Sequence, residues 1–475
     1  MSFFRLLRIK SAMFVLTTVV VFAVIGLDFV FKKYHLESRK VRYRLHGANQ
    51  NISLYGDNVN MTRGNQHDED KHGVVERYGG AQNIQEPNNS VHGENHKYQS
   101  NLENEQWYNV IYRTIPCGNA EINTILSPRR HYLKIRNRTV VEDSIYWSKE
   151  FEKLIPEEKR NKMEPPKSQL GRANVMYIAR SDDKHKCGEF GSQNNAYVIL
   201  DDGTEWCARY KKPCFILGEV MAYMFTKWMC MNYIPPLILT KPDPRTHLWG
   251  SKTVKKFMKE HEWNSNNTIS MTQWLPSIKR SKAPPIINTN NGLIHVDNPA
   301  FKNITEQQIL DLMVYSDTVV IDNLMGVTDR VLAMYLQKPC PQRSIRNCFV
   351  DENRNTWWLD NEAAFLIGYL KQYVHYVQLN ETLKTVCIFR RQTVSKIIQL
   401  HQIKDAPLLL WKLVGKYKNI IGIDWIPGTP MTCESNSYIR WAELFKERIE
   451  DVYRWIVRCS KDKYESLLNE YQTNL

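Results

Sequence analysis

Two aspartates between positions 319 and 369 stand where side chains could do chemistry. Asp329 follows a long apolar run, at the point where a predicted helix gives way to a loop. Asp360 ends a short hydrophobic run that predicts a strand, and Asn361 and Glu362 follow it. One carboxylate at a helix end and another at a strand end is how phosphoryl-transfer sites separate proton acceptance from metal binding. On residue type alone, the commoner role of such aspartates is to cap a helix or a turn or to form a salt bridge.

A β-hairpin is predicted upstream of the two aspartates. The strand-like runs 196–200 and 204–210 are joined by a turn around Gly203. A segment with two glycines, 188–191, precedes the first run, and in a kinase-like lobe it would cover the phosphates. Two glycines in a loop more often only make turns, so this signal is weak alone. The second strand carries a basic residue, Arg209.

An apolar helix is predicted to open at Gly218-Glu219 and to run through Met231. In the first turn, the Glu219 carboxylate would be favoured by the helix dipole. Its alternative role is to pair with the basic residue of the hairpin or to help hold a metal. The sequence alone leaves both roles open.

The order of the elements predicts a two-lobed α+β architecture, with a β-rich N-lobe and a helical C-lobe. Strand-like runs come first, and apolar residues at helical spacing dominate afterwards. Between the two aspartates lies an insertion with Cys340 and Cys348, which are close enough in sequence to form a disulfide. Helices are predicted at 306–325, 386–401, 408–417 and 441–458.

The formal net charge of +14 suggests anionic partners, such as nucleotide phosphates or acidic protein surfaces. Nucleic acid is not expected, because the basic residues are scattered and the chain is predicted to leave the cytosol. The apolar run 11–31 follows a short basic tail, 1–10, and is long enough to cross a bilayer. Without a clear cleavage site, it predicts a retained signal anchor.

The orientation of this anchor is not decided by its flanking charges, because more Lys and Arg follow it than precede it. All ten cysteines and all glycosylation sequons lie on its C-terminal side, which predicts a type II protein with a lumenal domain and disulfides. Residues 32–105 are polar and form a predicted disordered stem, and 106–475 form the lumenal domain. The sequons are at Asn51, Asn60, Asn88, Asn137, Asn266, Asn303 and Asn380.

Residues 321–330 resemble the catalytic-loop motif of the secretory-pathway kinases, and 358–369 resemble the Asp-Asn-Glu motif of their Four-jointed branch. The matches keep their order and extend over most of the chain from about Tyr146 to Cys459. Further matching segments are Cys187-Gly188, Cys207-Ala208-Arg209-Tyr210, Gly218-Glu219, Ile234-Pro235-Pro236 and 385–390.

The resemblance implies an atypical, two-lobed protein kinase of the Golgi membrane that uses ATP with Mn²⁺ or Mg²⁺. Its Ser/Thr substrates would be secreted or cell-surface proteins such as cadherin repeats, in planar polarity and growth signalling. Cleavage of the stem would release a secreted form. By position, Asp329 would be the catalytic base and Asp360 a metal ligand. Glu219 would face the nucleotide and its metal, and Arg209 and Lys211 would contact the nucleotide.

Two departures from ordinary protein kinases stand out, and two alternative functions stay open. The first departure bears on catalytic strength, and the second argues only against a cytosolic-type kinase. Arg209 stands where a lysine is expected, and the two are not interchangeable; Met334 stands five residues after Asp329, where asparagine is usual. The first alternative is a catalytically weak pseudokinase or scaffold of the Golgi-associated kinase-like branch. The second is a type II glycosyltransferase, but the Asp-x-Asp spacing that such enzymes use occurs only at 68–70, in the stem.

Overall fold

The computed structural model describes residues 126, 131–155, 173–180, 187, 195–288, 292–336, 344–370, 372–434 and 437–473. The predicted anchor, the stem and the glycine-containing loop lie outside these residues. Over the described ranges, no helix is both long and apolar enough to cross a membrane.

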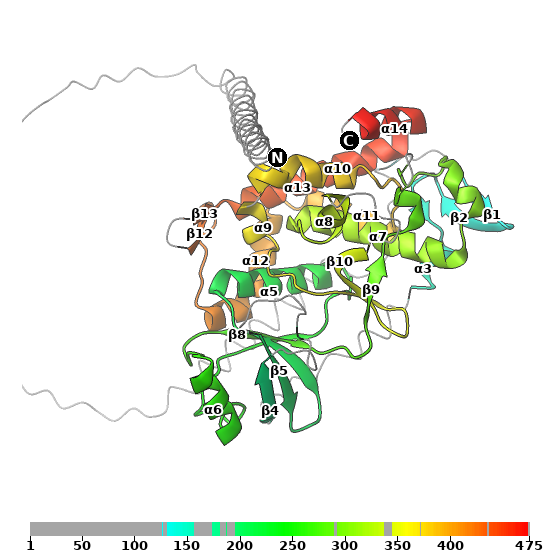
Figure 1. Ribbon diagram of the computed structural model, residues 1–475. Helices are drawn as coiled ribbons and strands as arrows, with labels where there is room; N and C mark the ends of the chain where they lie inside the picture. Colours follow the sequence, from blue (N-terminus) through cyan, green and yellow to red (C-terminus); the bar gives the residue numbers. More distant parts are fainter. Residues whose placement is uncertain are drawn as a thin grey trace, which may run out of the picture. The chain divides into compact units, whose positions relative to one another are not determined.

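A five-stranded antiparallel sheet forms one half of the described structure, shown in green in Figure 1. Its buried face packs on α6 (Lys252–Glu260) through Trp206, Val254 and Phe257, in a hydrophobic cluster of its own. In spatial order the strands are β4 (Val175–Arg180), β5 (Asn195–Leu200), β6 (Glu205–Arg209), β8 (Ile269–Gln273) and β7 (Leu237–Thr240).

The predicted hairpin is confirmed as β5 and β6. Gly203 has a φ of +80°, which a residue without Cβ adopts easily. The Asp202 carboxylate accepts a hydrogen bond from the Thr204 amide (2.9 Å) and closes the turn. The antiparallel register places Arg209, the last residue of β6, opposite Asn195 on one side and Ser270 on the other. Arg209 thus lies at the end of a central strand.

Helix α5 (Pro213–Trp228) begins five residues earlier than predicted. Pro213 occupies its first turn, where a missing N–H costs nothing. Glu219 is therefore in the second turn and buried, so the predicted first-turn position is wrong and the helix dipole does not explain this residue. The helix is buried nearly all round, because it packs into the core of the helical half.

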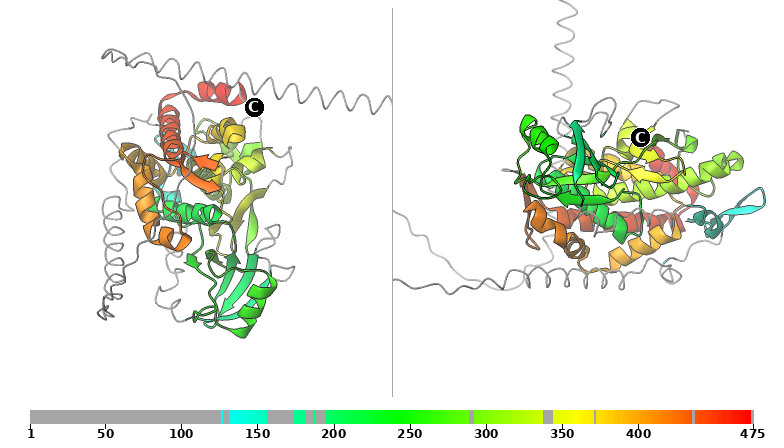
Figure 2. Two further views of the ribbon diagram at one scale, coloured as in Figure 1. Left: turned by 90° about the vertical axis from the view of Figure 1, so that its left-hand side faces the viewer. Right: turned by 90° about the horizontal axis from the view of Figure 1, so that it is seen from below.

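The helical half has a second, larger hydrophobic cluster, and Figures 1 and 2 show its helices beyond the sheet. The predicted two-lobed α+β architecture is confirmed, although α5 and α6 lie between strands of the sheet in the chain and β10 to β13 follow α7. The bounds predicted for α7 are also confirmed, because Thr305 and Gln308 form a capping box and Gly326 ends the helix at a φ of +70°. The helices are α7 (Glu306–Met325), α8 (Val331–Leu336), α9 (Ile367–Leu370), α10 (Gln372–Leu383), α11 (Arg391–Gln402), α12 (Ala406–Ile421), α13 (Trp441–Lys461) and α14 (Tyr464–Thr473).

The remaining strands form small two- and three-stranded sheets, and α3 is a short helix. The sheet β11-β10-β9 combines one strand that precedes α7 in the chain with two that follow α8, and the loop that carries Asp360 follows β11. The elements are β1 (Leu133–Ile135), β2 (Arg138–Glu142), β3 (Tyr146–Trp147), α3 (Lys149–Glu152), β9 (Lys279–Lys282), β10 (Ser344–Val350), β11 (Thr356–Trp358), β12 (Met431–Glu434) and β13 (Ser437–Ile439).

Disulfides join distant parts of the described chain, as predicted for a lumenal domain. Cys348 is instead buried with a free thiol, so the suggested bridge to Cys340 is not formed; Cys340 itself lies outside the described residues. The described pairs are Cys187–Cys207, Cys214–Cys433 and Cys387–Cys459.

Candidate active site

The guanidinium of Arg209 gathers three carboxylates from distant segments. Its Nη1 lies 2.6 Å from Asp360 Oδ1 and 3.1 Å from Glu219 Oε1. Glu362 Oε2 lies 3.8 Å from the same nitrogen. Strand β6 supplies the cation, α5 supplies Glu219, and the loop after β11 supplies the other two. The cluster therefore joins the sheet to the helical half.

Burial and the neighbouring charges shift the pKa values of the residues in this cluster. Burial lowers the pKa of Arg209, but the carboxylates of Glu219 and Asp360 outweigh burial, so the pKa rises above its ordinary value. Burial raises the pKa of Asp360, but the charge and hydrogen bond of Arg209 outweigh it, so this pKa is lowered. The pKa of Glu219 is raised, because its burial outweighs the attraction of Arg209.

Lys211 and Glu362 form a second ion pair at the edge of this cluster. Lys211 Nζ lies 3.1 Å from Glu362 Oε2. In an extended segment, residues two apart point to the same side, so Lys211 follows Arg209 toward the same loop. Glu362 was not among the predicted site residues, although its place in the Asp-Asn-Glu motif was the signal that could have found it.

Asp360 is held by a tight loop. Its φ of +57° is in the left-handed region, which residues other than glycine seldom adopt, and it turns the chain sharply after β11. Helix α5 packs directly on this loop, because a Cβ on Gly218 would come within 2.5 Å of the Glu362 carbonyl oxygen. Glycine at 218 therefore allows the helix that carries Glu219 to approach the loop that carries Asp360.

Asp329 lies in the loop between α7 and α8, as predicted. Its Oδ2 accepts a hydrogen bond of 2.8 Å from the Asn347 side-chain amide. Its Oδ1 is buried and receives no hydrogen bond from another residue of the described ranges. Burial raises the pKa of Asp329, and the negative charge of Asp360 adds to this while Arg330 opposes it. A carboxylate with one oxygen held and the other unoccupied is suited to accept a proton.

Arg330 ties the Asp329 loop to the Asp360 loop. Its Nη1 lies 2.6 Å from Asp322 Oδ1 in the last turns of α7, and its Nη2 donates to Asn361 Oδ1. The guanidinium also lies over the Trp358 ring, 5.0 Å from the centroid. The side chain is fully buried, so it fixes the two loops relative to each other.

The donor chemistry suits a hard divalent cation. Glu219 and Asp360 present carboxylate oxygens, which Mg²⁺ and Mn²⁺ prefer, and both approach a single positively charged nitrogen of Arg209. Mg²⁺ usually takes one or two carboxylates and completes its shell with water and substrate phosphates. The described residues contain no group of three or more His, Cys, Asp or Glu arranged to hold a metal by themselves.

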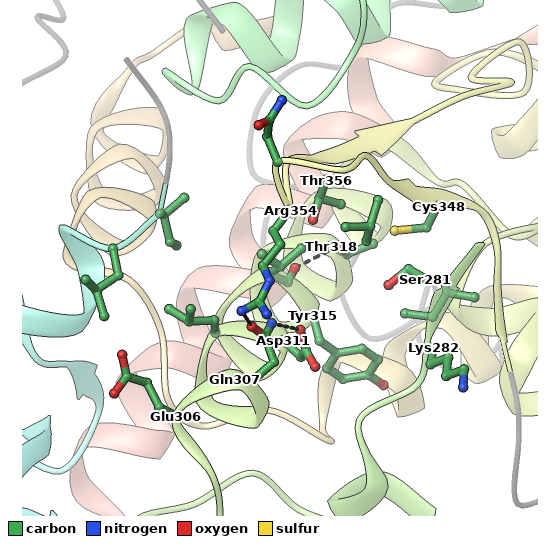
Figure 3. A pocket seen from close by; sticks show the side chains of 17 residues that line it. Ser281, Lys282, Glu306, Gln307, Asp311, Tyr315, Thr318, Cys348, Arg354 and Thr356 are labelled. Atoms are coloured by element: carbon green, nitrogen blue, oxygen red, sulfur yellow. Dashed lines mark hydrogen bonds between the residues drawn. The ribbon is translucent and has the colours of Figure 1, made fainter. Parts of the chain in front are cut away.

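A cavity of about 300 Å³ lies elsewhere, between α7 and the β11-β10-β9 sheet. Figure 3 shows Arg354 reaching Gln307 across it, and Gln307 donates to Asp311 Oδ1 (2.9 Å). None of the predicted site residues lines this cavity. It is therefore separate from the Arg209 cluster.

The structure thus brings four predicted residues, Arg209, Lys211, Glu219 and Asp360, into one cluster. It places Asp329 near enough for the charge of Asp360 to affect its pKa. Their roles remain predictions. Sequence reasoning did not single out Glu362, Asn347 or Arg330; only Glu362 and Arg330 stand in a recognisable motif.

A family model and a curated relative both match this chain to Four-jointed box proteins. The family model of the Four-jointed box protein middle domain matches residues 162–462. Four-jointed box protein 1 of Mus musculus is 24% identical over 337 residues, which are 69% of this chain and 70% of that protein.

More distant similarities accompany this match. The extracellular serine/threonine protein kinase four-jointed of Drosophila melanogaster is 22% identical over 321 residues, which cover 55% of this chain and 52% of that protein. A crystal structure of the Golgi casein kinase with Mn/ADP bound has a TM-score of 0.37 and 12% identity, with 63% of this chain and 76% of that chain covered.

Proposed function

We propose that this chain, which belongs to the Four-jointed box family, is a serine/threonine protein kinase of the Golgi lumen. It would transfer the γ-phosphate of ATP to secreted or cell-surface proteins. The name of the Drosophila relative, an extracellular serine/threonine protein kinase, supports this activity. Cadherin repeats are the acceptors that the sequence resemblance implies.

The observation that carries the proposal is the meeting of Arg209, Glu219 and Asp360 at one point. In protein kinases a basic residue on a strand pairs with a glutamate on a helix, and a metal-binding aspartate lies next to them. Here Arg209 of β6 contacts Glu219 of α5 at 3.1 Å and Asp360 at 2.6 Å. Asp329, with a free carboxylate oxygen, lies within electrostatic reach.

The mechanism follows from these positions. Asp329 would accept the proton of the acceptor hydroxyl as its oxygen bonds to the γ-phosphorus, and the bond from that phosphorus to the β–γ bridging oxygen breaks. ADP leaves with the electron pair of that bond. Asp360 and Glu219 would hold Mn²⁺ or Mg²⁺, which neutralises phosphate charge when bound. Arg209 and Lys211 would orient the nucleotide, since positioning supplies much of the rate in phosphoryl transfer.

A transfer assay tests this function. The full chain, produced in a secretory cell line and purified in detergent, is incubated with γ-labelled ATP, Mn²⁺ and a cadherin-repeat acceptor. We expect transfer to serine or threonine, and Asp329→Asn should lower kcat by about 10² to 10⁴-fold, the usual range for a general base. Full activity of Asp329→Asn would remove this residue from the role of base.

A second function, nucleotide binding without transfer, is favoured by one specific contact. Arg209 Nη1 occupies the point on which Glu219 and Asp360 converge, and it would compete there with a divalent cation. Thermal-shift titration with ATP and Mn²⁺ separates the two functions. Stabilisation by ATP without transfer to any acceptor would favour a pseudokinase or scaffold.

We further propose attachment to the Golgi membrane by the anchor 11–31, with a secreted form produced by cleavage in the stem 32–105. These segments lie outside the described residues. The Asp-x-Asp spacing of the glycosyltransferase alternative, at 68–70, lies outside them as well.

A further inference from the structure

Strand β10, in the insertion between the two site aspartates, departs from regular geometry at one residue. Its register with β9 shifts between Ser344 and Phe349. Within this interval, Asn347 has a φ of +56°, in the left-handed region. Bulges of this kind bend a strand and re-aim its side chains, and they are frequent beside active sites. Asparagine tolerates this conformation better than most residues.

The bulge touches both aspartate loops. The Asn347 side-chain amide donates to Asp329 Oδ2 at 2.8 Å. Its carbonyl oxygen accepts from the amide of Leu359, the residue before Asp360, at 3.0 Å. Asn347 therefore contacts both Asp329, the proposed base, and the loop that carries Asp360, the proposed metal ligand. The bulge thus forms part of the wall of the site.

Arg346 precedes this residue and is exposed. Its positive charge lowers the pKa of Asp329 and that of Asp360, so the guanidinium lies within electrostatic reach of both carboxylates. The transferred group must pass between the residue that deprotonates the acceptor and the residue that holds the metal. Arg346 is thus a cation on the solvent side of this region.

The other cations of the site are already committed. Arg209 is largely but not fully buried and contacts Asp360, Glu219 and Glu362. Lys211 pairs with Glu362 at 3.1 Å. Arg330 is fully buried between the two loops. Arg209 and Lys211 thus contact carboxylates of the site, and Arg330 is held by Asp322 and Asn361. A further cation beside the transferred group would stabilise the charge that develops on it during transfer.

We propose that Arg346 is a catalytic residue that contacts the γ-phosphoryl group of the bound nucleoside triphosphate. This inference rests on the proposed function. A guanidinium can donate two hydrogen bonds to phosphate oxygens, and it keeps its protons throughout. As the acceptor oxygen bonds to the γ-phosphorus and the bond to the bridging oxygen breaks, Arg346 stabilises charge on the three non-bridging oxygens. The acceptor proton passes to Asp329, and ADP leaves.

The test compares ligands that differ only in the γ-phosphate. Affinities of the purified full chain for ATP and for ADP are measured with Mn²⁺ present, together with kcat. In Arg346→Ala we expect ADP affinity to stay unchanged and ATP affinity to fall about tenfold, since a hydrogen bond to a charged group is lost. The kcat should fall about 10²-fold or more. Arg346→Lys, which keeps the charge, should recover part of both.

The matched control is Arg354→Ala, an exposed arginine in the turn after the same strand. Figure 3 shows that it points into the separate cavity and reaches Gln307. It should leave the ratio of ATP to ADP affinity and the kcat unchanged. Melting temperatures of all variants show whether the fold persists, which we expect because both arginines are exposed.

The outcomes separate this inference from the proposed function. Wild-type protein that transfers phosphate, with Arg346→Ala equal to it in kcat and in the ATP-to-ADP affinity ratio, overturns the role of Arg346 alone. Wild-type protein that binds neither nucleotide overturns the proposed function and this inference with it. If the wild type binds ATP without transferring phosphate, the ratio of ATP to ADP affinity still tests the role of Arg346. An unchanged ratio in Arg346→Ala then overturns the inference.

Discussion

Arg209 Nη1 donates a hydrogen bond of 2.6 Å to Asp360 Oδ1 across 151 positions of sequence. This contact joins the last residue of a central sheet strand to a loop of the helical half. Glu219 on α5 completes the junction through the same nitrogen. The relative position of the sheet and the helices in the candidate site is therefore fixed by charge, and the same charges are available to a nucleotide and its metal.

Removal of Arg209 should destabilise the protein. Arg209→Met leaves the buried Glu219 carboxylate without its cation, and breaking a buried pair in this way typically costs about 3 kcal/mol or more. Adding Glu219→Gln should recover part of the loss, because the uncompensated charge is then gone. Free energies of unfolding from denaturant titration of the three proteins check this. Equal stability of Arg209→Met and the wild type would contradict the account of the cluster.

The packing of α5 on the Asp360 loop should be sensitive to one methyl group. A Cβ at position 218 would lie 2.5 Å from the Glu362 carbonyl oxygen, which is backbone and cannot move aside freely. Gly218→Ala should therefore lower the free energy of unfolding by about 1–3 kcal/mol, the usual cost of overpacking. Alanine is otherwise a better helix former than glycine. An unchanged or increased stability would show that the loop does not approach the helix this closely.

Features with a local cause could be predicted from the sequence. The bounds of α7 follow from Thr305 at its start and Gly326 at its end, and the β5–β6 hairpin follows from the turn at Gly203. The start of α5 was missed because the apolar pattern suggested Gly218, whereas Pro213 sets the first turn. Local signals thus define most elements but not the depth at which Glu219 is buried.

The rest of the site depends on contacts between distant segments. Asn347 contacts Asp329 from the irregular part of β10, where the register with β9 shifts, and the sequence around it shows no sign of that shift. The fit of Gly218 against the backbone at Glu362 is equally invisible before the helix and the loop are placed together. Residue type and motif order can predict which carboxylates meet, whereas the side chains that hold them depend on tertiary packing.

The pH dependence of phosphoryl transfer should report the pKa of Asp329. Only the ionised carboxylate accepts a proton, and burial raises this pKa above its ordinary value. Transfer should therefore decline with falling pH, starting at a higher pH than an ordinary aspartate would give. The Asn347 amide favours the ionised form through its hydrogen bond. Asn347→Ala should raise the pKa further and move the decline to still higher pH.

Profiles of kcat against pH for the wild type and Asn347→Ala measure this shift. Asn353→Ala, which changes an exposed asparagine in the turn after β10, is the matched control and should leave the profile unchanged. Superimposable profiles for the wild type and Asn347→Ala would contradict the role of the bulge in setting the protonation of Asp329.

The sequon at Asn380 should carry no glycan in the folded protein. Its Oδ1 accepts hydrogen bonds from Asn323 (3.1 Å) and from Arg448 (2.9 Å), so the amide is held inside a contact between helices. Peptide mapping by mass spectrometry, with and without enzymatic deglycosylation, would detect occupancy. A glycan on Asn380 of secreted, folded chain would contradict this packing. Exposed sequons of the described residues, where we expect glycans, are Asn137, Asn266 and Asn303.

The most direct test of the central claim is the effect of Asp360→Ala on phosphate transfer to a cadherin-repeat acceptor with Mn²⁺. Glu352→Ala, which removes an exposed carboxylate before the same strand β11, is the control. We expect the wild type and Glu352→Ala to transfer phosphate at equal rates, and Asp360→Ala to lose transfer while a cooperative melting transition shows that it still folds. Transfer by Asp360→Ala at the wild-type rate would contradict the assignment of this site as a kinase active site.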